Sequence, residues 1–416
     1  MKKEITVDVA IAGVGVGGLF TALHLPRELK VLMLCKEDMK SCDSMLAQGG
    51  ICVLRDDEDY DSFFEDTMRA GHYENRKESV DIMIRSSRNV IDQLVELGVR
   101  FNKNPDGSLQ YTKEGAHSKP RICFHEDVTG KEITETLQRR VKALPNVTIL
   151  EYTTMTDLLT FRGRCTGMVA ETREGEHLLI HAKDTVLATG GIGGLYEHST
   201  NFPSLTGDAL RVAEKHGVEL EHLDYVQIHP TSLYTEKPGR SFLISESARG
   251  EGAILLNNRG ERFVDELLPR DVVSQAIQKE MEKEGSRHVW LSFEKVSKET
   301  IQHHFPNIYR TCLQEGYDIT KEPIPVVPAQ HYFMGGVHVD SNSETTMAHL
   351  YAVGETSCNG VHGKNRLASN SLLESLVFAE RAAARIEKEQ RTAAICIAEG
   401  QKERKRYESN YHAACC

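Results

Sequence analysis

The fold is decided by residues 7–35, which read VDVAIAGVGVGGLFTALHLPRELKVLMLC. The apolar runs at its two ends predict buried parallel strands. Between them lie Gly13, Gly15 and Gly18 in the spacing GxGxxG, directly before a helical face. These glycines permit a tight turn, close approach of the backbone to a pyrophosphate and close packing of the helix, whose first N–H groups face the anion. The stretch therefore predicts a Rossmann-like domain that binds a dinucleotide; a glycine-rich turn without a ligand is the alternative.

The end of the second strand lacks the residue expected there. In dinucleotide-binding folds an Asp or Glu about 20 residues after the glycines holds a ribose hydroxyl. Cys35 occupies this position, and Lys36, Glu37 and Asp38 follow it. Either one of these acids reaches back to the ribose, or a backbone group takes its place.

Composition disfavours several classes of protein. The chain has 416 residues, enough for more than one domain, and its net charge of −11 argues against nucleic acid or anionic membranes as partners. Its 10 cysteines show no CxxC and no Cys/His ligand spacing, so we expect no metal site and a cytoplasmic location. No stretch approaches the apolar length of a membrane span.

The order of motifs along the chain predicts two domains. A strand that runs into Ala188-Thr189-Gly190-Gly191 places small residues beside a ligand. Residues 223–330 change character, and prolines within 323–328 mark a return. We expect an α/β fold with a dinucleotide-binding domain of residues 1–222 and 331–392, an inserted α+β capping domain of residues 223–330, and a short C-terminal tail of residues 393–416.

Local patterns predict two helix boundaries and one loop contact. An apolar stripe predicts helix over residues 59–97, ending at Gly98. Thr129-Gly130-Lys131-Glu132 has the spacing of a capping box. Residues 44–50, a loop of small residues with one amide, are expected to lie against a flat ring.

Two polar segments are candidate substrate contacts. The loop 102–127 mixes carboxylate, imidazole and guanidinium groups, among them Glu114, Arg121 and His125. Further along, Asp271 is expected to cap a helix, so that Arg270 points outward at the helix start.

Seven motifs in order along the chain carry a resemblance to a known family. They are GxGxxG, Ala47-Gln48-Gly49-Gly50, Ala188-Thr189-Gly190-Gly191, His229-Pro230-Thr231, Arg249-Gly250-Glu251-Gly252, Pro269-Arg270-Asp271 and the run from Asn365 to Leu373. From about Val7 to Glu387 the chain resembles the L-aspartate oxidases, within the fumarate reductase and succinate dehydrogenase flavoprotein superfamily. Each motif is modest alone, and their order makes the resemblance specific.

The resemblance implies that the dinucleotide is FAD. Its pyrophosphate would lie at the first helix and its ring against residues 47–50, and the start of the last helix would stabilise negative charge on the ring. Asp43 stands where succinate dehydrogenases carry the histidine that tethers FAD, which implies non-covalent FAD. The implied FAD-binding residues are Gly13, Gly15, Gly17, Gly18, Cys35, Lys36, Ser44, Ala47, Gln48, Gly49, Gly50, Ala188, Thr189, Gly190, Asp208, Glu355, Asn370, Ser371 and Leu372.

The resemblance also implies a four-carbon dicarboxylate as substrate. Cationic clamps would hold its carboxylates and orient its Cα–H toward the flavin N5. Glu114 matches the acid with which aspartate oxidases hold the substrate ammonium group, and Arg270 is implied to transfer a proton. The implied catalytic residues are Arg270, His229, His331, Arg366, Glu114 and Ser245. Without the family, an Arg beside an Asp is more often a structural ion pair, and a His before Pro a core residue.

The expected reaction is the oxidation of L-aspartate to iminoaspartate, with oxygen or fumarate as electron acceptor, as the first step toward quinolinate and NAD. The product is unstable in water, so quinolinate synthase is the expected functional partner. A soluble fumarate reductase or succinate dehydrogenase flavoprotein subunit is the alternative, and a flavin-bound protein without activity is a third. Asp43 and Glu114 favour the oxidase. The C-terminal helical bundle of longer relatives is expected to be absent.

Overall fold

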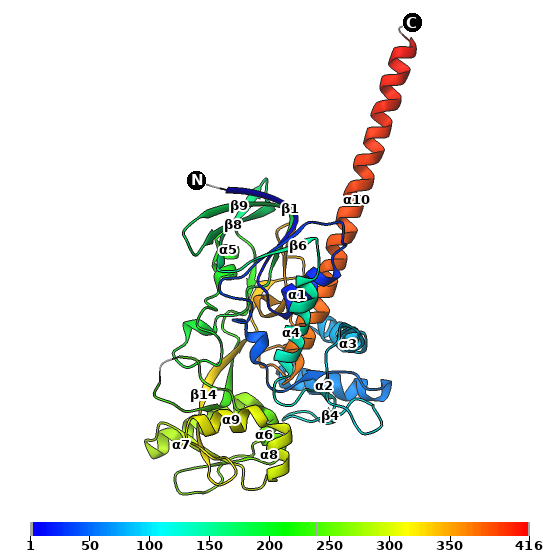
Figure 1. Ribbon diagram of the computed structural model, residues 1–416. Helices are drawn as coiled ribbons and strands as arrows, with labels where there is room; N and C mark the ends of the chain where they lie inside the picture. Colours follow the sequence, from blue (N-terminus) through cyan, green and yellow to red (C-terminus); the bar gives the residue numbers. More distant parts are fainter. Residues whose placement is uncertain (1–2, 238, 415–416) are drawn as a thin grey trace.

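The computed structural model describes residues 3–237 and 239–414, and side chains as far as residue 392. A mixed sheet forms the core of its first part (Figure 1). The sheet has seven strands in the order β6-β2-β1-β9-β8-β7, and β16 pairs with β9. The parallel strands are β1 (Lys3–Ala12), β2 (Val31–Leu34), β6 (Val147–Leu150), β9 (His177–Leu187) and β16 (Leu350–Ala352). The antiparallel ones are β7 (Thr153–Phe161) and β8 (Arg164–Thr172).

Strand β1 lies inside the sheet, as its apolar sequence predicts. Its residues 9–11 are fully buried, because covered parallel strands bury both of their faces. Ala12 pairs with Leu34 of β2 on one side and with Leu187 of β9 on the other, and Leu187 pairs with Ala352 of β16. The carboxyl ends of these strands therefore meet at one edge, where ligands bind in open α/β sheets. The predicted Rossmann-like fold is confirmed.

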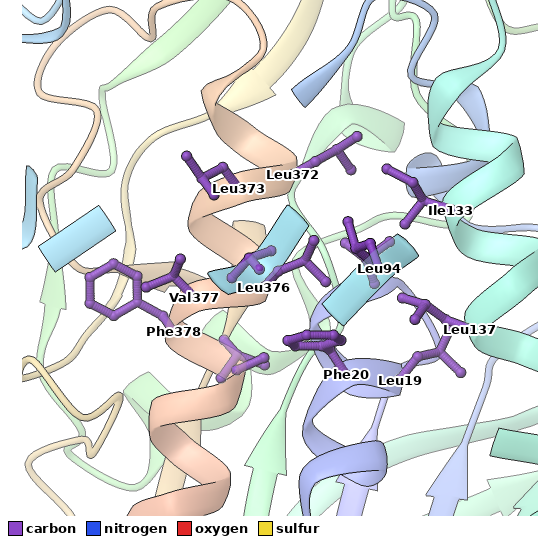
Figure 2. Close-up of a cluster of buried hydrophobic side chains, with 14 of the residues drawn as sticks. Leu19, Phe20, Leu94, Ile133, Leu137, Leu372, Leu373, Leu376, Val377 and Phe378 are labelled. Carbon is purple, nitrogen blue, oxygen red and sulfur yellow. The ribbon is translucent and has the colours of Figure 1, made fainter. Parts of the chain in front are cut away.

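A helical layer covers one face of this sheet. It contains α1 (Val16–His24), α3 (Lys77–Leu97), α4 (Thr129–Lys142) and the start of α10 (Asn370–Ala414). Figure 2 shows Leu19 and Phe20 of α1 packed among Leu94 of α3, Leu137 of α4 and Leu376 of α10. Each such side chain contributes about 1.5–3 kcal/mol when taken fully out of water. This apolar contact fixes α1, and with it the glycine turn, against the rest of the domain.

The helix expected over residues 59–97 is interrupted. The structure has two helices there, α2 (Tyr60–Ala70) and α3, and His72 and Tyr73 between them have φ of 57° and 60°. These left-handed residues end the first helix, which an apolar stripe alone does not reveal. The predicted end at Gly98 is confirmed, since it has φ of 103° and closes α3.

The predicted capping box at residues 129–132 is wrong. The helix N-cap is Val128, and Thr129 lies in the first turn of α4. The Thr129 hydroxyl donates to the carbonyl oxygen of Gly49 at 2.6 Å. The Glu132 carboxylate accepts from the Arg100 guanidinium at 2.9 Å. Both side chains have tertiary partners, and these replace the local cap.

A second sheet forms a separate layer with its own core. Its strands are β11 (Val226–Leu233), β14 (Ile324–Phe333), β13 (Val289–Ser292) and β12 (Ile254–Leu256), in that order. The helices around it are α6 (Glu246–Gly250), α7 (Arg270–Glu284), α8 (Lys298–His304) and α9 (Pro306–Gln314), at the end of the molecule away from β8 and β9 (Figure 1). This is the expected inserted α+β part; its exact limits, residues 223–330, stay a prediction.

The remaining short strands form two small sheets, and one further helix accompanies them. They are β3 (Ile51–Cys52), β5 (Ile122–Cys123) and β4 (Tyr111–Thr112) in one small sheet, β10 (Leu220–Glu221), β15 (Gly336–His338) and β17 (Ser357–Cys358) in another, and helix α5 (Asp208–Lys215).

Helix α10 runs for 45 residues and extends away from the body of the molecule (Figure 1). It is held to the central sheet by Tyr351, whose hydroxyl donates to Glu389 at 2.8 Å, and by Gln390, which donates to Asp184 at 2.7 Å. The tail expected at residues 393–416 continues this helix as far as Ala414, and residues 415–416 lie outside the described chain. Within residues 3–237 and 239–414, no helix combines the length and the apolar composition that a membrane crossing requires.

Candidate active site

One large cleft follows the carboxyl edge of the parallel strands and continues to the second sheet. It holds about 1690 Å³ of empty space, its open mouth included. The cleft has two ends, one lined by the glycine turn and residues 34–38, the other by side chains of α6, α7 and the segment before α10.

The glycine turn at the first end has no room for a side chain at Gly13. A Cβ on Gly13 would lie 1.9 Å from the carbonyl oxygen of Ala188, and Gly13 has φ of 119°. The N–H of Val16, at the start of α1, donates to the Ser44 hydroxyl at 3.1 Å. Residues 13–17 thus line the cleft with little beyond backbone at the N-terminus of α1, which is the arrangement that a dinucleotide pyrophosphate requires.

Residues 44–50 form a loop tied to both parts of the molecule. The Gln48 amide donates to the carbonyl oxygen of Leu243, in the second part, at 2.7 Å. The Thr129 hydroxyl donates to the carbonyl oxygen of Gly49, and Gly130 N–H donates to that of Ala47 at 2.8 Å. The start of α4 therefore positions this loop. The sequence singles out Thr129 only as a cap and misses this role.

The fold brings the carboxylate of Asp208, the first residue of α5, close to the end of the second strand. Burial raises the pKa of the Cys35 thiol to about 12, so it is neutral. Lys36 donates to the Asp208 carboxylate at 2.8 Å and to the Thr206 hydroxyl at 2.9 Å. Burial opposes ionisation of Asp208, but the hydrogen bond from Lys36 holds its pKa below the usual range. An ionised carboxylate from α5 thus joins Glu37 and Asp38 at this end of the cleft.

Two half-buried carboxyl groups lie along the middle of the cleft. Glu355 accepts from Phe333 N–H at 2.9 Å, and burial raises its pKa to about 8. Asp43 accepts from Phe202 N–H at 2.9 Å, burial raises its pKa to about 7, and its Oδ2 has no hydrogen-bond partner among the described residues. Asp43 offers no imidazole for a covalent link.

Most of the residues predicted to bind the cofactor line this cleft; two do not. Gly18 packs within α1, where a Cβ would lie 2.4 Å from the carbonyl oxygen of Gly13. Asn370 is fully buried, and its amide donates to the Thr67 hydroxyl at 3.2 Å. The other predicted residues among the cleft lining are Gly13, Gly15, Gly17, Cys35, Lys36, Ser44, Ala47, Gln48, Gly49, Gly50, Ala188, Thr189, Gly190, Asp208, Glu355, Ser371 and Leu372.

Arg270 is the first residue of α7 and points into the second end of the cleft. Its Nε donates to Glu246 at 2.5 Å and its Nη1 to Gln227 at 2.9 Å. The N-cap of α7 is Pro269, so the prediction that Asp271 caps this helix is wrong. Asp271 instead contacts His72, whose Nε2 lies 3.1 Å from its carboxylate. Arg270 is therefore fixed by buried partners and not by a cap.

Arg366 is a second buried cation close to the first. Its guanidinium lies over the Tyr332 ring at 4.4 Å from the centroid, and its Nη1 donates to the Ser371 hydroxyl at 3.1 Å. Burial and the neighbouring Arg270 lower its pKa to about 10. Its Nε is buried and has no hydrogen-bond partner among the described residues. Two neighbouring cations in a buried site favour an anionic ligand.

His229 and His331 lie edge to face beside these arginines, with ring centroids 5.1 Å apart. His229 is fully buried and its Nε2 lies 3.0 Å from the carbonyl oxygen of Ile244. His331 Nδ1 lies 2.8 Å from the Thr200 hydroxyl. Burial and the nearby Arg270 hold the pKa of both rings well below the usual range, so both are neutral.

Glu114 lies at the same end and is held by two hydroxyl groups. Ser247 donates to its Oε1 at 2.8 Å and Ser369 to its Oε2 at 2.5 Å. A Cβ on Gly49 would lie 2.3 Å from Oε1, so the carboxylate rests directly on the glycine loop. Ser245 is the N-cap of α6, and its hydroxyl donates to that of Ser247 at 3.1 Å. A chain of hydroxyl groups therefore leads from Ser245 to Glu114.

Glu114 is the residue of the polar loop 102–127 that lines the cleft. Arg121 is fully buried beside it and pairs with Asp59 at 2.9 Å and with Asp66 at 2.7 Å. Arg121 also donates to His117 Nδ1 at 3.1 Å, which leaves His117 Nε2–H to donate to the carbonyl oxygen of Ala368 at 3.0 Å. Arg121 thus supports the loop from behind and is not a substrate contact.

Sequence reasoning missed four residues that hold the predicted ones, namely Gln227, Glu246, Ser247 and Ser369. Two signals were present. Gln227 precedes His229 by two residues, which places both on one face of a strand. Glu246 and Arg249 are three apart at a helix start, which places them on one helix face. For Ser247 we find no signal in the sequence, because its partner Glu114 is 133 residues away.

Comparison with known proteins agrees with this geometry. Residues 8–372 match the family described as FAD binding domain. The chain is 51% identical over 387 residues to the L-aspartate oxidase of Clostridium perfringens, covering 93% of this chain and 87% of that protein. It is 40% identical over 405 residues to the L-aspartate oxidase of Pseudomonas aeruginosa, covering 92% of this chain and 75% of that one.

A solved structure extends the similarity to the fold. A mutant of the E. coli quinol fumarate reductase superposes with a TM-score of 0.88 at 32% identity, over 97% of this chain and 74% of that one.

Proposed function

Since this chain belongs to the L-aspartate oxidase family, within the FAD-binding flavoproteins, we propose that its cleft oxidises L-aspartate to iminoaspartate, with fumarate or oxygen as electron acceptor. The observation that carries the proposal is the meeting of Glu114 with Arg270 and Arg366 at one end of a cleft whose other end is a dinucleotide cradle. L-aspartate has two carboxylates and one ammonium group; Arg270 and Arg366 can hold the carboxylates, and Glu114 can hold the ammonium group.

FAD is the cofactor, and the residues present fit it. The glycine turn suits its pyrophosphate, Lys36 and Asp208 suit its adenosine end, and Ser371 and Leu372 at the start of α10 suit its ring edge. Asp43 supports non-covalent binding, because it has a carboxylate at the position of the histidine that links FAD covalently in succinate dehydrogenases. When bound, FAD supplies the acceptor for the hydride that leaves the substrate Cα.

The arginines orient the substrate. Arg270 and Arg366 repel each other in a buried site, and a dicarboxylate between them relieves that repulsion while its two ends become fixed. The rings of His229 and His331 are neutral, and they supply polar contacts and line the substrate end of the cleft. The Ser245 hydroxyl lies at the far end of the hydroxyl chain that leads to Glu114, and it is the proposed polar contact to a substrate carboxylate. Arg270 is the proposed proton-transfer residue when fumarate is reduced in the same place.

Glu114 gives the site its preference for an amine. Its two serine partners and the contact with Gly49 fix the position of its carboxylate, so that it is preorganised to accept hydrogen bonds from an ammonium group. Succinate has no ammonium group, so the site with ionised Glu114 has no cation on the ligand to balance that charge, which disfavours succinate.

Three wider proposals accompany the activity. We retain residues 223–330 as the capping domain. The cytoplasm is the proposed location, supported by seven described cysteines that are all buried free thiols. Quinolinate synthase is the proposed functional partner, because an imine product hydrolyses in water unless it is consumed quickly.

Anaerobic reduction of the purified yellow protein tests the proposal. L-aspartate is expected to bleach the flavin absorbance and succinate is not. Bleaching by succinate alone would identify a succinate dehydrogenase flavoprotein instead. Absence of bleaching by either, with flavin bound, would contradict both activities.

Arg270→Leu tests the clamp. The change removes a cation that holds the substrate, so the rate of bleaching by L-aspartate should fall by about 10²–10³-fold while FAD remains bound. Arg287→Leu is the matched control, since Arg287 lies on the same part of the molecule with 77% of its side chain exposed, and should bleach at the unchanged rate. Equal rates in the two variants would remove Arg270 from the mechanism.

A further inference from the structure

The two serines around Glu114 can serve it in either of its protonation states. A hydroxyl group both donates and accepts hydrogen bonds. When Glu114 is ionised, Ser247 and Ser369 both donate to it, at 2.8 Å and 2.5 Å. When it is protonated, one serine rotates its hydroxyl and accepts from the carboxylic acid. Ser369 is held in a left-handed conformation with φ of 62°, and its oxygen also accepts from Gly50 N–H at 3.2 Å, which fixes its position for both states.

The charged groups around Glu114 leave a small positive excess. Glu246 and Arg249 face it from α6, Arg270 from α7, Arg366 from the segment before α10, and the neutral Cys52 thiol from β3. With both glutamates ionised, the three guanidinium groups exceed the carboxylates by one charge. L-aspartate, with two carboxylates and one ammonium group, carries one net negative charge and balances this excess.

Fumarate carries two negative charges and has no ammonium group. In the same cleft it leaves an uncompensated negative charge next to the buried Glu114. Such a charge in a buried site is relieved by taking up a proton. Burial and the neighbouring Glu246 already raise the pKa of Glu114 above its usual range. Glu114 is also the carboxylate whose ammonium partner is missing when fumarate is bound, and its two serine hydroxyls can satisfy the protonated form, so the proton is added there.

We infer that Glu114 works in two protonation states, ionised against the ammonium group of L-aspartate and protonated when fumarate occupies the same cleft. The proton comes from solvent and binds at Glu114 when fumarate enters. One cleft thereby accepts both the amino acid that is oxidised and the dicarboxylate that is reduced. This inference rests on the proposed function and adds the means by which a site selective for an amine also takes a substrate without one.

Fumarate binding to the oxidised holoenzyme measures the proton directly, because no turnover occurs. We would titrate fumarate between about pH 6 and 9, follow the flavin absorbance change for Kd, and count protons by calorimetry in buffers of different ionisation enthalpy. Above the pKa of Glu114 the Kd should rise tenfold per pH unit, with one proton taken up per fumarate. Glu114→Gln, which is always neutral, should bind fumarate with a Kd that does not change with pH and with no proton uptake. Glu96→Gln on the exposed face of α3 is the matched control and should behave as the unchanged protein.

A Kd that does not change with pH in the unchanged protein, or a slope that persists in Glu114→Gln, would overturn the inference. If Glu114→Gln fails to retain FAD, Ser247→Ala gives a second test. Loss of one donor destabilises the ionised form, so the pH at which the Kd begins to rise should move up by about one pH unit. An unmoved pH dependence in Ser247→Ala would also count against the inference. Anaerobic bleaching by L-aspartate in the same preparation separates the two failures, since bleaching without proton uptake rejects only the two-state role of Glu114.

Discussion

The two ends of the cleft are built from different materials. The end that suits the FAD pyrophosphate consists of backbone groups, where Gly13 approaches the carbonyl oxygen of Ala188 and Val16 N–H points to the Ser44 hydroxyl. The end that suits the substrate consists of charged side chains brought together from far apart. Ser369 is 255 residues from Glu114, and Arg270 is 43 residues from Gln227.

This difference determines what each end tolerates. Backbone cradles depend on the absence of a side chain at a few positions, so adding a single methyl group destroys them. Charged sites depend on buried partners, so removing one partner leaves a charge without compensation. The three variants below test these two kinds of sensitivity against each other and against a position outside both.

Gly13→Ala should have the largest effect. The new Cβ would meet the Ala188 carbonyl oxygen at 1.9 Å, and φ of 119° disfavours any residue but glycine, so the turn must open. We expect purified protein without bound FAD, measured as the ratio of flavin to protein absorbance. Gly163→Ala is the control, because Gly163 also has a positive φ of 77° but meets nothing within 4 Å. Retention of FAD by Gly13→Ala would show that the turn can adjust to a Cβ at this position and still bind FAD.

Arg121→Met tests the buried ion pairs that support the loop carrying Glu114 at the substrate end of the cleft. The change leaves Asp59 and Asp66 buried without their cation, and the free energy of unfolding should fall by about 3–5 kcal/mol. Chemical denaturation followed by flavin release measures this. Arg85→Met, which removes an exposed ion pair to Asp81, should leave the midpoint unchanged. If both variants unfold at the same denaturant concentration, the Arg121 network does not support the loop.

Gly98→Ala should have the smallest effect. Gly98 ends α3 with φ of 103°, and the nearest atom to a new Cβ would be Arg140 Nη2 at 3.7 Å, so the change adds only backbone strain. We expect about 1 kcal/mol of lost stability, seen as a small drop in the thermal midpoint, with FAD content and activity unchanged. Loss of FAD in this variant would mean that glycine turns outside the cleft also control the cofactor.

The fold could be predicted largely from sequence because its signals are local. The strand, the glycine turn and the helix of residues 7–35 are contiguous, and the order of motifs placed the second part correctly between two portions of the first. The errors arose where tertiary contacts replaced local ones. Thr129 bonds to Gly49 and does not cap α4, and the left-handed residues His72 and Tyr73 divide the expected long helix.

The candidate site could be predicted only in part. The resemblance supplied Arg270, Arg366 and Glu114, and these side chains do line one end of the cleft. Their supports could not be predicted, because Ser247 and Ser369 approach Glu114 from segments that no local pattern connects to it. Asn370 lies in a predicted motif and is nevertheless turned into the core.

Gly49 has a consequence for how such an enzyme can be redesigned. Its missing Cβ leaves the space that Glu114 Oε1 occupies, at 2.3 Å from where that carbon would be. The loop beside the cofactor and the group that reads the amine thus share one small volume. A designer who wants a different substrate and replaces Glu114 with a bulkier side chain must redesign the loop at the same time, and one who changes Gly49 alters the substrate preference. The two must be exchanged together, as one module.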